Sequence, residues 1–586
     1  MSARFLIVFE PRAEEVPVFE RARRLPGLEI VCDSRGLLVM VRSDCPHERL
    51  PNGRGVIVGR TRRAGQAGPA ALAELGTGFG RAVLGSGGSV LFDHVWGEYL
   101  AVVVERDRSA FVIARDPSGA IPCYLHRQDG LSMVSDDLSH LDALATRSAE
   151  IAQEPLCGML VYRDLRSRRT CLAGIEEIFP GEVALVAPSG IATLHQWTPT
   201  KVLRARPAHS TWEAAVDGVG SAVRLAVDAQ LRGVARPLVT VSGGLDSSIV
   251  SACLSAGRET IGFTTLYPGP HGDERRYVEP LARHLGLRLH AGEPSLAAID
   301  LVSSRAADLP RPCARSLLGA EETLLARLRG TMPFDAVFTG NGGDGVLGYL
   351  FSALPLLDRL ERPGGWRDIV RLADRIALMH GVTIWEVLGR ARRARKSPAP
   401  AWPRDLSFVR DGRDLAVPYH PWLDDLEEVA LGKRSQIRSL VSMHNHFEGS
   451  PLSRRLPVLS PLASQPVVET CLAVPSWFNV AGGRNRAVAR AAFADVLPPE
   501  VARRVTKGGP EGLGLAIYDR HRADLRSMLL DGALRQRGLI DGPSLEAALL
   551  DDRTRADGRW FRICLLADAE AWVRARLSNA GAPPTA

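Results

Sequence analysis

Short apolar runs separated by turn residues dominate the chain up to about residue 205. Such runs occur at residues 99–104, 111–114 and 182–186, with Gly, Pro and Asp in the intervening segments. Apolar runs of this length between turn residues predict β-strands. Helical periodicity is sparse in this part of the sequence, so the pattern predicts a β-rich domain over residues 1–205.

A different pattern follows. Residues 201–209 are charged and contain proline, which predicts a linker. Ser210 and Glu213 then form a capping box ahead of the amphipathic residues 214–231, which predicts a helix. We therefore expect a second domain at residues 206–586.

Strands and helices alternate at the start of this second domain. Apolar residues 238–241 and 260–266 predict strands, and residues 247–254 and 274–285 predict helices. This alternation is typical of a parallel α/β sheet. Beyond residue 320, segments rich in Leu, Ala and Arg predict helices packed around that sheet, so the fold class is predicted to be α/β.

Composition limits the possible classes of protein. A chain of 586 residues is too long for one hydrophobic core, and 45% hydrophobic with 24% charged residues is typical of a soluble protein. No apolar run is long enough for a membrane span, and the start is too short in apolar residues for a secretory signal. The nine cysteines never form a C-x-x-C pair, which supports neither a disulfide framework nor a zinc site. We expect a cytoplasmic enzyme with no membrane partner.

The net charge of +7 raises the question of nucleic-acid binding. The excess is spread along the chain, and its densest run, residues 390–396, has no interleaved aromatic residues. Such a run is more typical of a solvated helix face than of a nucleic-acid site. We expect no nucleic-acid partner.

The most informative feature is a loop of glycines and small hydroxyl residues at 242–248, directly after the apolar run that ends at Val241. A strand that opens through glycines into a helix presents backbone N–H groups to phosphate. No Walker string follows a strand in this sequence, so the loop is a different phosphate-binding device. The predicted ATP-binding residues are Val241, Ser242, Gly243, Gly244, Asp246, Ser247, Ser248, Thr265, Gly340 and Asn341.

Four residues are predicted to carry the chemistry. Asp246 and Asp344 follow neighbouring predicted strands, so together they could hold one Mg²⁺ ion on the phosphates. Glu274 offers a carboxylate near the nucleotide, and Lys507 supplies a cation in the flexible loop 507–510. We expect Asp246, Asp344, Glu274 and Lys507 to be catalytic.

The Ser-Gly-Gly-x-Asp-Ser pattern resembles the PP-loop of the ATP pyrophosphatases, and the segments together resemble the asparagine synthetase family over nearly the whole chain. This resemblance implies cleavage of ATP to AMP. Residues 96–99 and 114–124 look like the interior of a class II glutamine amidotransferase domain of the Ntn type, whose nucleophile is an N-terminal cysteine. This chain has Ser2 there, and its first cysteine is Cys32. Ser2 as a substitute nucleophile is the less favoured reading, so we expect the domain to make no ammonia.

If the N-terminal domain makes no ammonia, the amine must already belong to the substrate. Within the family that this chain resembles, such substrates are typical of β-lactam synthetases and lasso peptide cyclases. Residues 459–469, 475–477, 482–486 and 497–510 look most like the lasso peptide cyclases. That resemblance implies AMP activation of an Asp or Glu side chain in a leaderless core peptide, followed by capture by the peptide's N-terminal amine. It also implies a leader peptidase and a leader-binding protein as partners.

Two alternatives stay open behind this hypothesis. Asn341 stands where asparagine synthetases carry Glu and β-lactam synthetases carry Tyr, which places β-lactam formation second and asparagine-type amidotransfer behind it. An α-amino group has a pKa of about 7.7–8.0, so neutralising it at pH 7 costs only about 1 kcal/mol and requires no strong base. Glu274 and the polar run at residues 444–448 are candidate helpers in this step.

Overall fold

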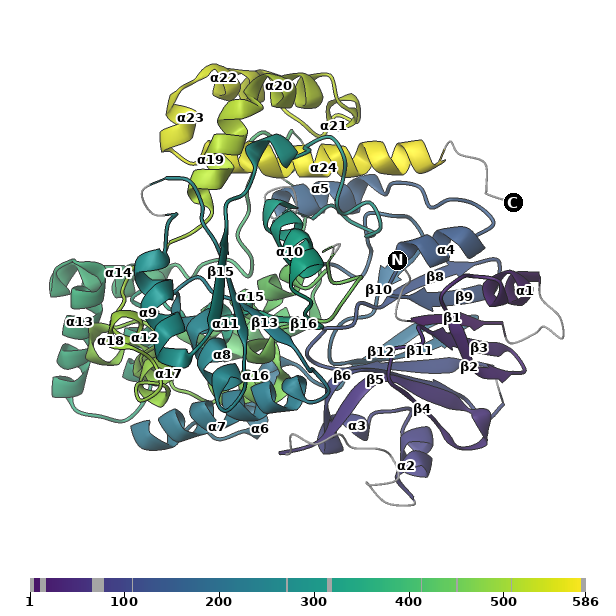
Figure 1. Cartoon of the computed structure of the whole chain (residues 1–586), viewed down its shortest axis with the longest axis horizontal. Coiled ribbons are helices and arrows are strands. Elements are labelled where there is room, and N and C mark those ends of the chain that lie inside the picture. The colour runs from purple at the N-terminus through teal and green to yellow at the C-terminus, as the bar shows by residue number, and fades with distance from the viewer. Residues whose placement is uncertain are drawn as a thin grey trace.

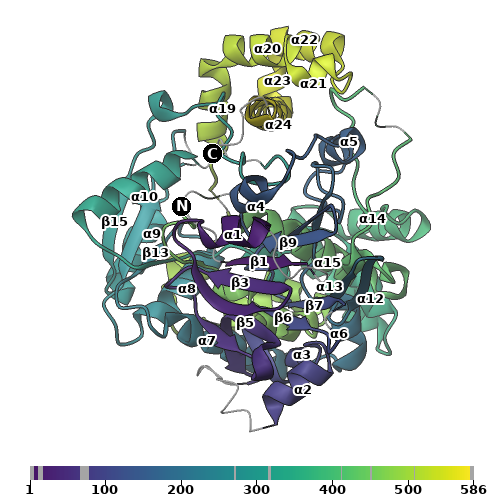
Figure 2. The same ribbon diagram turned by 90° about the vertical axis from the view of Figure 1, so that its right-hand side faces the viewer.

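The computed structural model describes residues 5–10, 17–65, 78–107, 109–269, 272–313, 319–410, 412, 414–448, 450, 452–506 and 508–580. Figures 1 and 2 show a β-rich N-terminal domain packed against a larger domain with a parallel sheet. The predicted fold class is confirmed. Two residues singled out in the sequence, Ser2 and Lys507, lie outside the described ranges.

Two antiparallel six-stranded sheets build the N-terminal domain. The first has the order β10 (Ile175–Glu177), β8 (Tyr124–Gln128), β9 (Leu131–Ser135), β1 (Phe5–Phe9), β3 (Leu37–Val41), β2 (Glu29–Ser34). The second has the order β12 (Gly190–His195), β11 (Glu182–Ala187), β7 (Phe111–Arg115), β6 (Val95–Val104), β5 (Gly55–Arg63), β4 (His47–Arg49). The strands predicted at 99–104, 111–114 and 182–186 lie within β6, β7 and β11.

Both faces of the first sheet are buried, and the two-residue period of β1 shows how. Phe5, Ile7 and Phe9 belong to the core between the two sheets, which also contains Val102 and Ile113. The alternate residues of β1 belong to the core that also contains residues of α1 (Pro17–Arg23) and α4 (Leu138–Leu144). Successive side chains of a strand point to opposite faces, so a fully apolar strand has both faces covered. The remaining helices here are α2 (Phe79–Gly85), α3 (Leu91–His94) and α5 (Gln153–Val161).

A parallel five-stranded sheet lies at the centre of the second domain (Figure 1). Its order is β15 (Arg288–Gly292), β14 (Ile261–Thr265), β13 (Pro237–Thr240), β16 (Ala336–Phe338), β17 (Val458–Leu459). Val239 of β13 belongs to one core with residues of α7 (Trp212–Leu231) and α8 (Leu245–Ser255). Its neighbour Leu238 belongs to another core with residues of α10 (Gly319–Thr331). Helices therefore cover both faces, as parallel sheets require, and α9 (Arg275–Leu285) follows β14.

The connection between the domains differs from the prediction in two details. The predicted linker begins inside a helix, α6 (Pro199–Ala205), whose N-cap Thr198 accepts a hydrogen bond from the Lys201 backbone N–H. Proline at the first helical position has its φ fixed near helical values, which favours this start. The cap of α7 is Thr211 instead of the predicted Ser210, with its side chain accepting from the Ala214 N–H. The boundary near residue 205 stays a prediction.

Helices fill most of the remaining sequence, as predicted. They are α11 (Gly343–Val346), α12 (Leu354–Leu360), α13 (Trp366–His380), α14 (Ile384–Lys396), α15 (Leu431–Met443), α16 (Gln465–Leu472), α17 (Ala487–Ala492), α18 (Pro499–Ala502), α19 (Glu511–Arg520), α20 (Arg522–Leu530), α21 (Ala533–Gln536), α22 (Gly542–Leu550), α23 (Arg553–Ala556) and α24 (Arg559–Ala580). Helices α19–α24 form a lobe at the top of Figure 1, and Arg576 of α24 pairs with Asp142 of α4 at 2.9 and 3.1 Å. Within the described ranges, no helix has both the length and the apolarity to cross a membrane.

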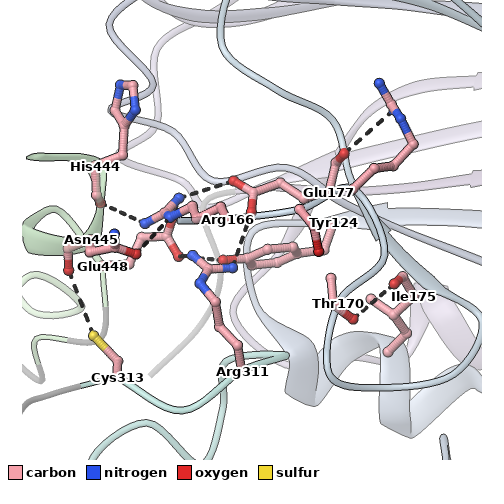
Figure 3. A network of polar contacts seen from close by, with 12 residues as sticks. Tyr124, Arg166, Thr170, Ile175, Glu177, Arg311, Cys313, His444, Asn445 and Glu448 are labelled. Atoms are coloured by element: carbon pink, nitrogen blue, oxygen red, sulfur yellow. Dashed lines mark hydrogen bonds and ion pairs between the residues drawn. The ribbon is translucent and has the colours of Figure 1, made fainter. Parts of the chain in front are cut away.

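A buried network of charges joins the two domains (Figure 3). Glu177 and Glu448, one from each domain, face Arg166 and Arg311. Arg166 Nη1 lies 3.0 Å from Glu177 Oε1 and 2.6 Å from Glu448 Oε1. Arg311 lies 3.1 Å from Glu177 Oε2 and 2.6 Å from Glu448 Oε2, and the Tyr124 hydroxyl also donates to Glu448. Arg115 Nη1 also lies 3.3 Å from Glu177 Oε1, so three buried guanidinium groups share two carboxylates. Every carboxylate therefore has cation partners, which a buried charge needs in order to persist.

The network fixes the charge state of Glu448. Burial alone would raise the pKa of this carboxyl, but Arg166 and Arg311 lower it from the ordinary 4.5 to about 2. A carboxyl whose pKa is depressed in the folded state stabilises that state above its unfolded pKa. This stabilisation is lost as the pH falls from 4.5 through 2.

We predict that Glu448→Gln lowers the free energy of unfolding by about 3–5 kcal/mol at pH 7, because three buried guanidinium groups then share one carboxylate. The difference from the parent should shrink between pH 4.5 and 2, since the parent carboxyl becomes protonated there. Urea unfolding followed by tryptophan fluorescence at a series of pH values measures both effects. Glu154→Gln is the matched control, because its pair with Arg169 is exposed and worth at most about 1 kcal/mol. Equal urea midpoints for the two variants would contradict a stabilising network.

Candidate functional site

The predicted phosphate loop lies at the carboxyl end of the central strand. β13 ends at Thr240, and α8 begins at Leu245 with Gly244 as its N-cap in an extended conformation. Gly243 has φ +62°, and a Cβ there would lie 2.6 Å from the Cβ of Tyr277. Only glycine adopts this conformation in so little space. The loop therefore opens onto the N-terminus of α8, where backbone N–H groups favour an anion.

Hydroxyl groups fasten this loop. The Ser247 hydroxyl accepts a hydrogen bond from the Ser242 N–H at 3.2 Å, and the Ser248 hydroxyl donates to the Gly244 carbonyl at 2.7 Å. Gly243 and Ser248 do not line the adjoining cavity. These two predicted ATP ligands stabilise the conformation of the loop. The other predicted residues do line the cavity, namely Val241, Ser242, Gly244, Asp246, Ser247, Thr265, Gly340 and Asn341. Their roles in binding stay predictions.

A second glycine-rich turn packs directly on the first. It follows β16, the neighbour of β13 in the sheet. A Cβ on Gly340 would lie 2.6 Å from the Ser247 nitrogen, and one on Gly343 would lie 2.4 Å from Cγ of Asp246. These glycines are required because the two turns approach so closely. The approach brings the carboxylate of Asp344 beside that of Asp246.

One guanidinium group bridges these two carboxylates. Arg486 Nη1 lies 2.6 and 2.7 Å from the two oxygens of Asp246 and 2.8 Å from Asp344 Oδ1. Arg486 has φ +55° at the N-cap of α17, and its guanidinium lies over the Tyr349 ring at 5.1 Å. The two carboxylates offer the oxygen ligands that Mg²⁺ prefers, and the ion would bind them beside this guanidinium or in its place.

Glu274 was expected to act in catalysis, and the structure gives it a different environment. It is buried, forms an ion pair with Arg504 and accepts a hydrogen bond from the Gly508 N–H at 3.2 Å. Arg504 also donates to the Ser242 carbonyl at 3.4 Å and stacks on the Tyr277 ring at 3.9 Å. Glu274 therefore holds the chain on either side of residue 507 against the phosphate loop.

The polar run at 444–448, also a candidate helper, divides in two. His444 is buried against the Trp422 ring at 4.7 Å, and burial together with Arg166 lowers its pKa well below the usual value. Glu448 is held in the domain interface, where it stays ionised. His446 lines the cavity that holds the phosphate loop. With such low pKa values, His444 and Glu448 are poor proton acceptors. His446 is the member of the run that faces the site.

Two neighbouring cavities lie at the carboxyl ends of the parallel strands. The larger, about 910 Å³, contains the phosphate loop, Asp246 and Asp344 at one side and Phe351 and Leu378 at another. The smaller, about 320 Å³, lies between the domains. Four residues line both cavities, namely Thr240, Glu321, Asn341 and His446.

Comparison with protein families gives this geometry a context. Residues 218–574, more than half of the chain, match the family described as asparagine synthase. The chain belongs to the asparagine synthase family. As a member, it is an ATP-dependent, AMP-forming carbon–nitrogen ligase. Residues 82–198 match the glutamine amidotransferase domain, in agreement with the β-rich fold of that part.

Two solved structures are among those similar to this asparagine synthase family member. One is the allosteric regulatory enzyme of purine biosynthesis, with 10% identity, a TM-score of 0.21, and coverage of 53% of this chain and 77% of that one. The other is glutamine phosphoribosylpyrophosphate amidotransferase from B. subtilis, with 10% identity, a TM-score of 0.20, and coverage of 51% and 78%. A search of curated proteins found no matching relative.

We predict that Asp246→Asn and Asp344→Asn each slow AMP formation by about 100-fold or more, because each removes charge that would position a divalent ion on the phosphates. Release of pyrophosphate in the presence of ATP, Mg²⁺ and the acyl substrate measures the rate. Asp368→Asn serves as the control, since this carboxylate is exposed and pairs with Arg359 and Arg371. A parental rate in either site variant would remove that residue from the site.

Proposed function

We propose that this ligase closes a macrolactam ring in a ribosomally made lasso peptide. An Asp or Glu side chain of the leaderless core peptide is activated as its acyl-adenylate, and the N-terminal amine of the same peptide captures it, with release of AMP and pyrophosphate. A leader peptidase and a leader-binding protein would supply the core peptide. The segments between residues 459 and 510 that resemble lasso peptide cyclases support this substrate class.

The observation that carries the proposal is the size and lining of the larger cavity. Its volume of about 910 Å³ approaches the upper end of the ~300–1,000 Å³ range of small-molecule sites. Phe351 and Leu378 line it while 63% and 72% exposed. Two exposed apolar side chains that line one cavity can contact apolar side chains of a bound molecule. The cavity therefore offers a phosphate site and, beside it, room for the side chains of a peptide.

Activation is the first chemical task. A carboxylate is a poor electrophile, so negative charge on the α-phosphate and the leaving pyrophosphate must be stabilised while the acyl-adenylate forms. The N–H groups at the start of α8 and the cation of Lys507 would serve this purpose, and each well-placed donor is worth about 3 kcal/mol. Asp246 and Asp344 would hold Mg²⁺, which supplies further positive charge when bound.

Capture by an amine is the second task, and the proposal takes that amine from the peptide itself. Burial raises the pKa of the Cys123 and Cys171 thiols in the N-terminal domain to about 12. A thiol must ionise to act as a nucleophile, so neither cysteine is suited to hydrolyse glutamine. Ordering a threaded tail costs about 1–2 kcal/mol per residue, which favours a wide binding surface for the peptide.

We predict that Lys507→Ala abolishes ring formation without lowering the thermal midpoint, because it removes the cation that would stabilise charge on the phosphates. Mass spectrometry of a candidate core peptide incubated with ATP and the parent enzyme should show the loss of one water. Lys396→Ala, at the exposed end of α14, is the control and should cyclise the peptide at the parental rate.

Omitting glutamine and ammonia should leave this product unchanged. A product that requires glutamine would establish amidotransfer instead. Ring closure on a small amino acid, with no reaction on peptides, would establish β-lactam-type chemistry. Parental activity of Lys507→Ala would remove the 507–510 loop from the site.

A further inference from the structure

Glu321 stands in the wall that the two cavities share. Of the four residues that line both cavities, Glu321 is the one carboxylate. It belongs to the first turn of α10, which begins at Gly319. Its side chain can therefore be reached from the phosphate-loop side and from the space between the domains.

A phenol holds this carboxylate in place. The Tyr267 hydroxyl donates to Glu321 Oε2 at 3.2 Å. Tyr267 follows β14, the strand beside β13, and its backbone N–H donates to the Gly272 carbonyl at 3.2 Å. A Cβ on Gly272 would lie 2.2 Å from the Tyr267 carbonyl oxygen, so this turn is tight. The phenol thus positions Glu321 from the same edge of the sheet that carries the phosphate loop.

The charges around Glu321 favour a proton acceptor. Burial raises its pKa, the Tyr267 hydrogen bond lowers it, and the adjacent Glu322 raises it, with a net rise above the ordinary value. The nearby Arg305 pairs with Glu322 at 3.3 Å. Within the described part of the chain Glu321 forms no ion pair, and a carboxylate with a raised pKa binds a proton more strongly than one held by a cation.

The other candidate groups are less suited. Glu274 is held by Arg504, and Glu448 is held by two arginines that keep its pKa at about 2. Asn341 shares the wall with Glu321, but an amide does not titrate. Glu321 is therefore the carboxylate of this site whose surroundings fit proton transfer.

We propose that Glu321 accepts the proton that the amine nitrogen loses when it attacks the acyl-adenylate. The nitrogen lone pair forms the C–N bond, the C–O bond to AMP breaks, and AMP leaves with that electron pair. The N–H proton passes to the Glu321 carboxylate. Tyr267 is a positioning residue in this step. The proposal rests on the ring closure proposed above.

A neutral amine does not remove the need for this group. The α-amino group is available in its neutral form at pH 7, but its nitrogen becomes positively charged as the C–N bond forms. The neutral amide forms only when that nitrogen loses its proton, so a carboxylate beside it accepts the proton as the C–N bond forms. General bases in this position contribute about 100- to 10,000-fold to the rate.

The test compares two nucleophiles on the same acyl-adenylate. Hydroxylamine is weakly basic, so the nitrogen that has attacked loses its proton to water readily, and hydroxamate formation needs no positioned base. Glu321→Gln should slow ring formation by about 100-fold or more, while hydroxamate forms near the parental rate. Mass spectrometry of a core peptide with ATP and Mg²⁺ measures both products. Glu386→Gln, which removes a carboxylate from an exposed ion pair with Arg390 on α14, is the control and should close the ring at the parental rate.

Each outcome decides the assignment. Ring formation by Glu321→Gln at the parental rate would overturn it, and so would equal loss of ring and hydroxamate, which would indicate a role in adenylation or folding. Recovery of ring formation by Glu321→Ala with added formate would support it, because formate can replace the missing carboxylate. If the parent forms its amide from added ammonia and closes no ring, the proposed function is wrong, and the same Glu321→Gln comparison on that amide then decides the role of Glu321.

Discussion

The rest of the site depends on one contact, the guanidinium of Arg486 between the carboxylates of Asp246 and Asp344. The two carboxylates follow adjacent parallel strands, and the glycines of both turns allow them to meet. Two like charges this close repel each other unless a cation lies between them. Arg486 supplies that cation, and the contact ties both strand ends to the chain that leads into α17.

The phosphate loop and the pair of aspartates could be predicted because each is defined by residues that are close together in the sequence. A strand, glycines, a carboxylate and a helix follow one another within about ten residues at each turn, and parallel strands bring such turns to one edge of the sheet. Arg486 and Arg504 were missed because the carboxylates they contact lie more than 140 residues away in sequence. The segment 482–486, Gly-Gly-Arg-Asn-Arg, does not by itself indicate which carboxylates its arginines contact.

The same limit applies to two segments whose roles in proton transfer stay predictions. Glu274 and the run at 444–448 have suitable residue types, but a role in proton transfer depends on the neighbours that burial provides. Arg504 neutralises Glu274, while Arg166 and Arg311 fix the charge of Glu448. Glu321 could not be predicted from the sequence, because only the folded structure shows that it lines both cavities. The N-terminal domain contributes in a similar way, since Glu98 and Asp137 complete the wall of the smaller cavity.

Identification of the nucleotide product tests the central claim that the edge of the parallel sheet binds ATP so that a carboxylate is adenylated. Purified protein with Mg²⁺, ATP and a core peptide should release AMP and pyrophosphate in equal amounts, and one ring should form for each AMP. Chromatography of the nucleotides together with a pyrophosphate assay measures this ratio. Release of ADP and inorganic phosphate during ring formation would contradict the account.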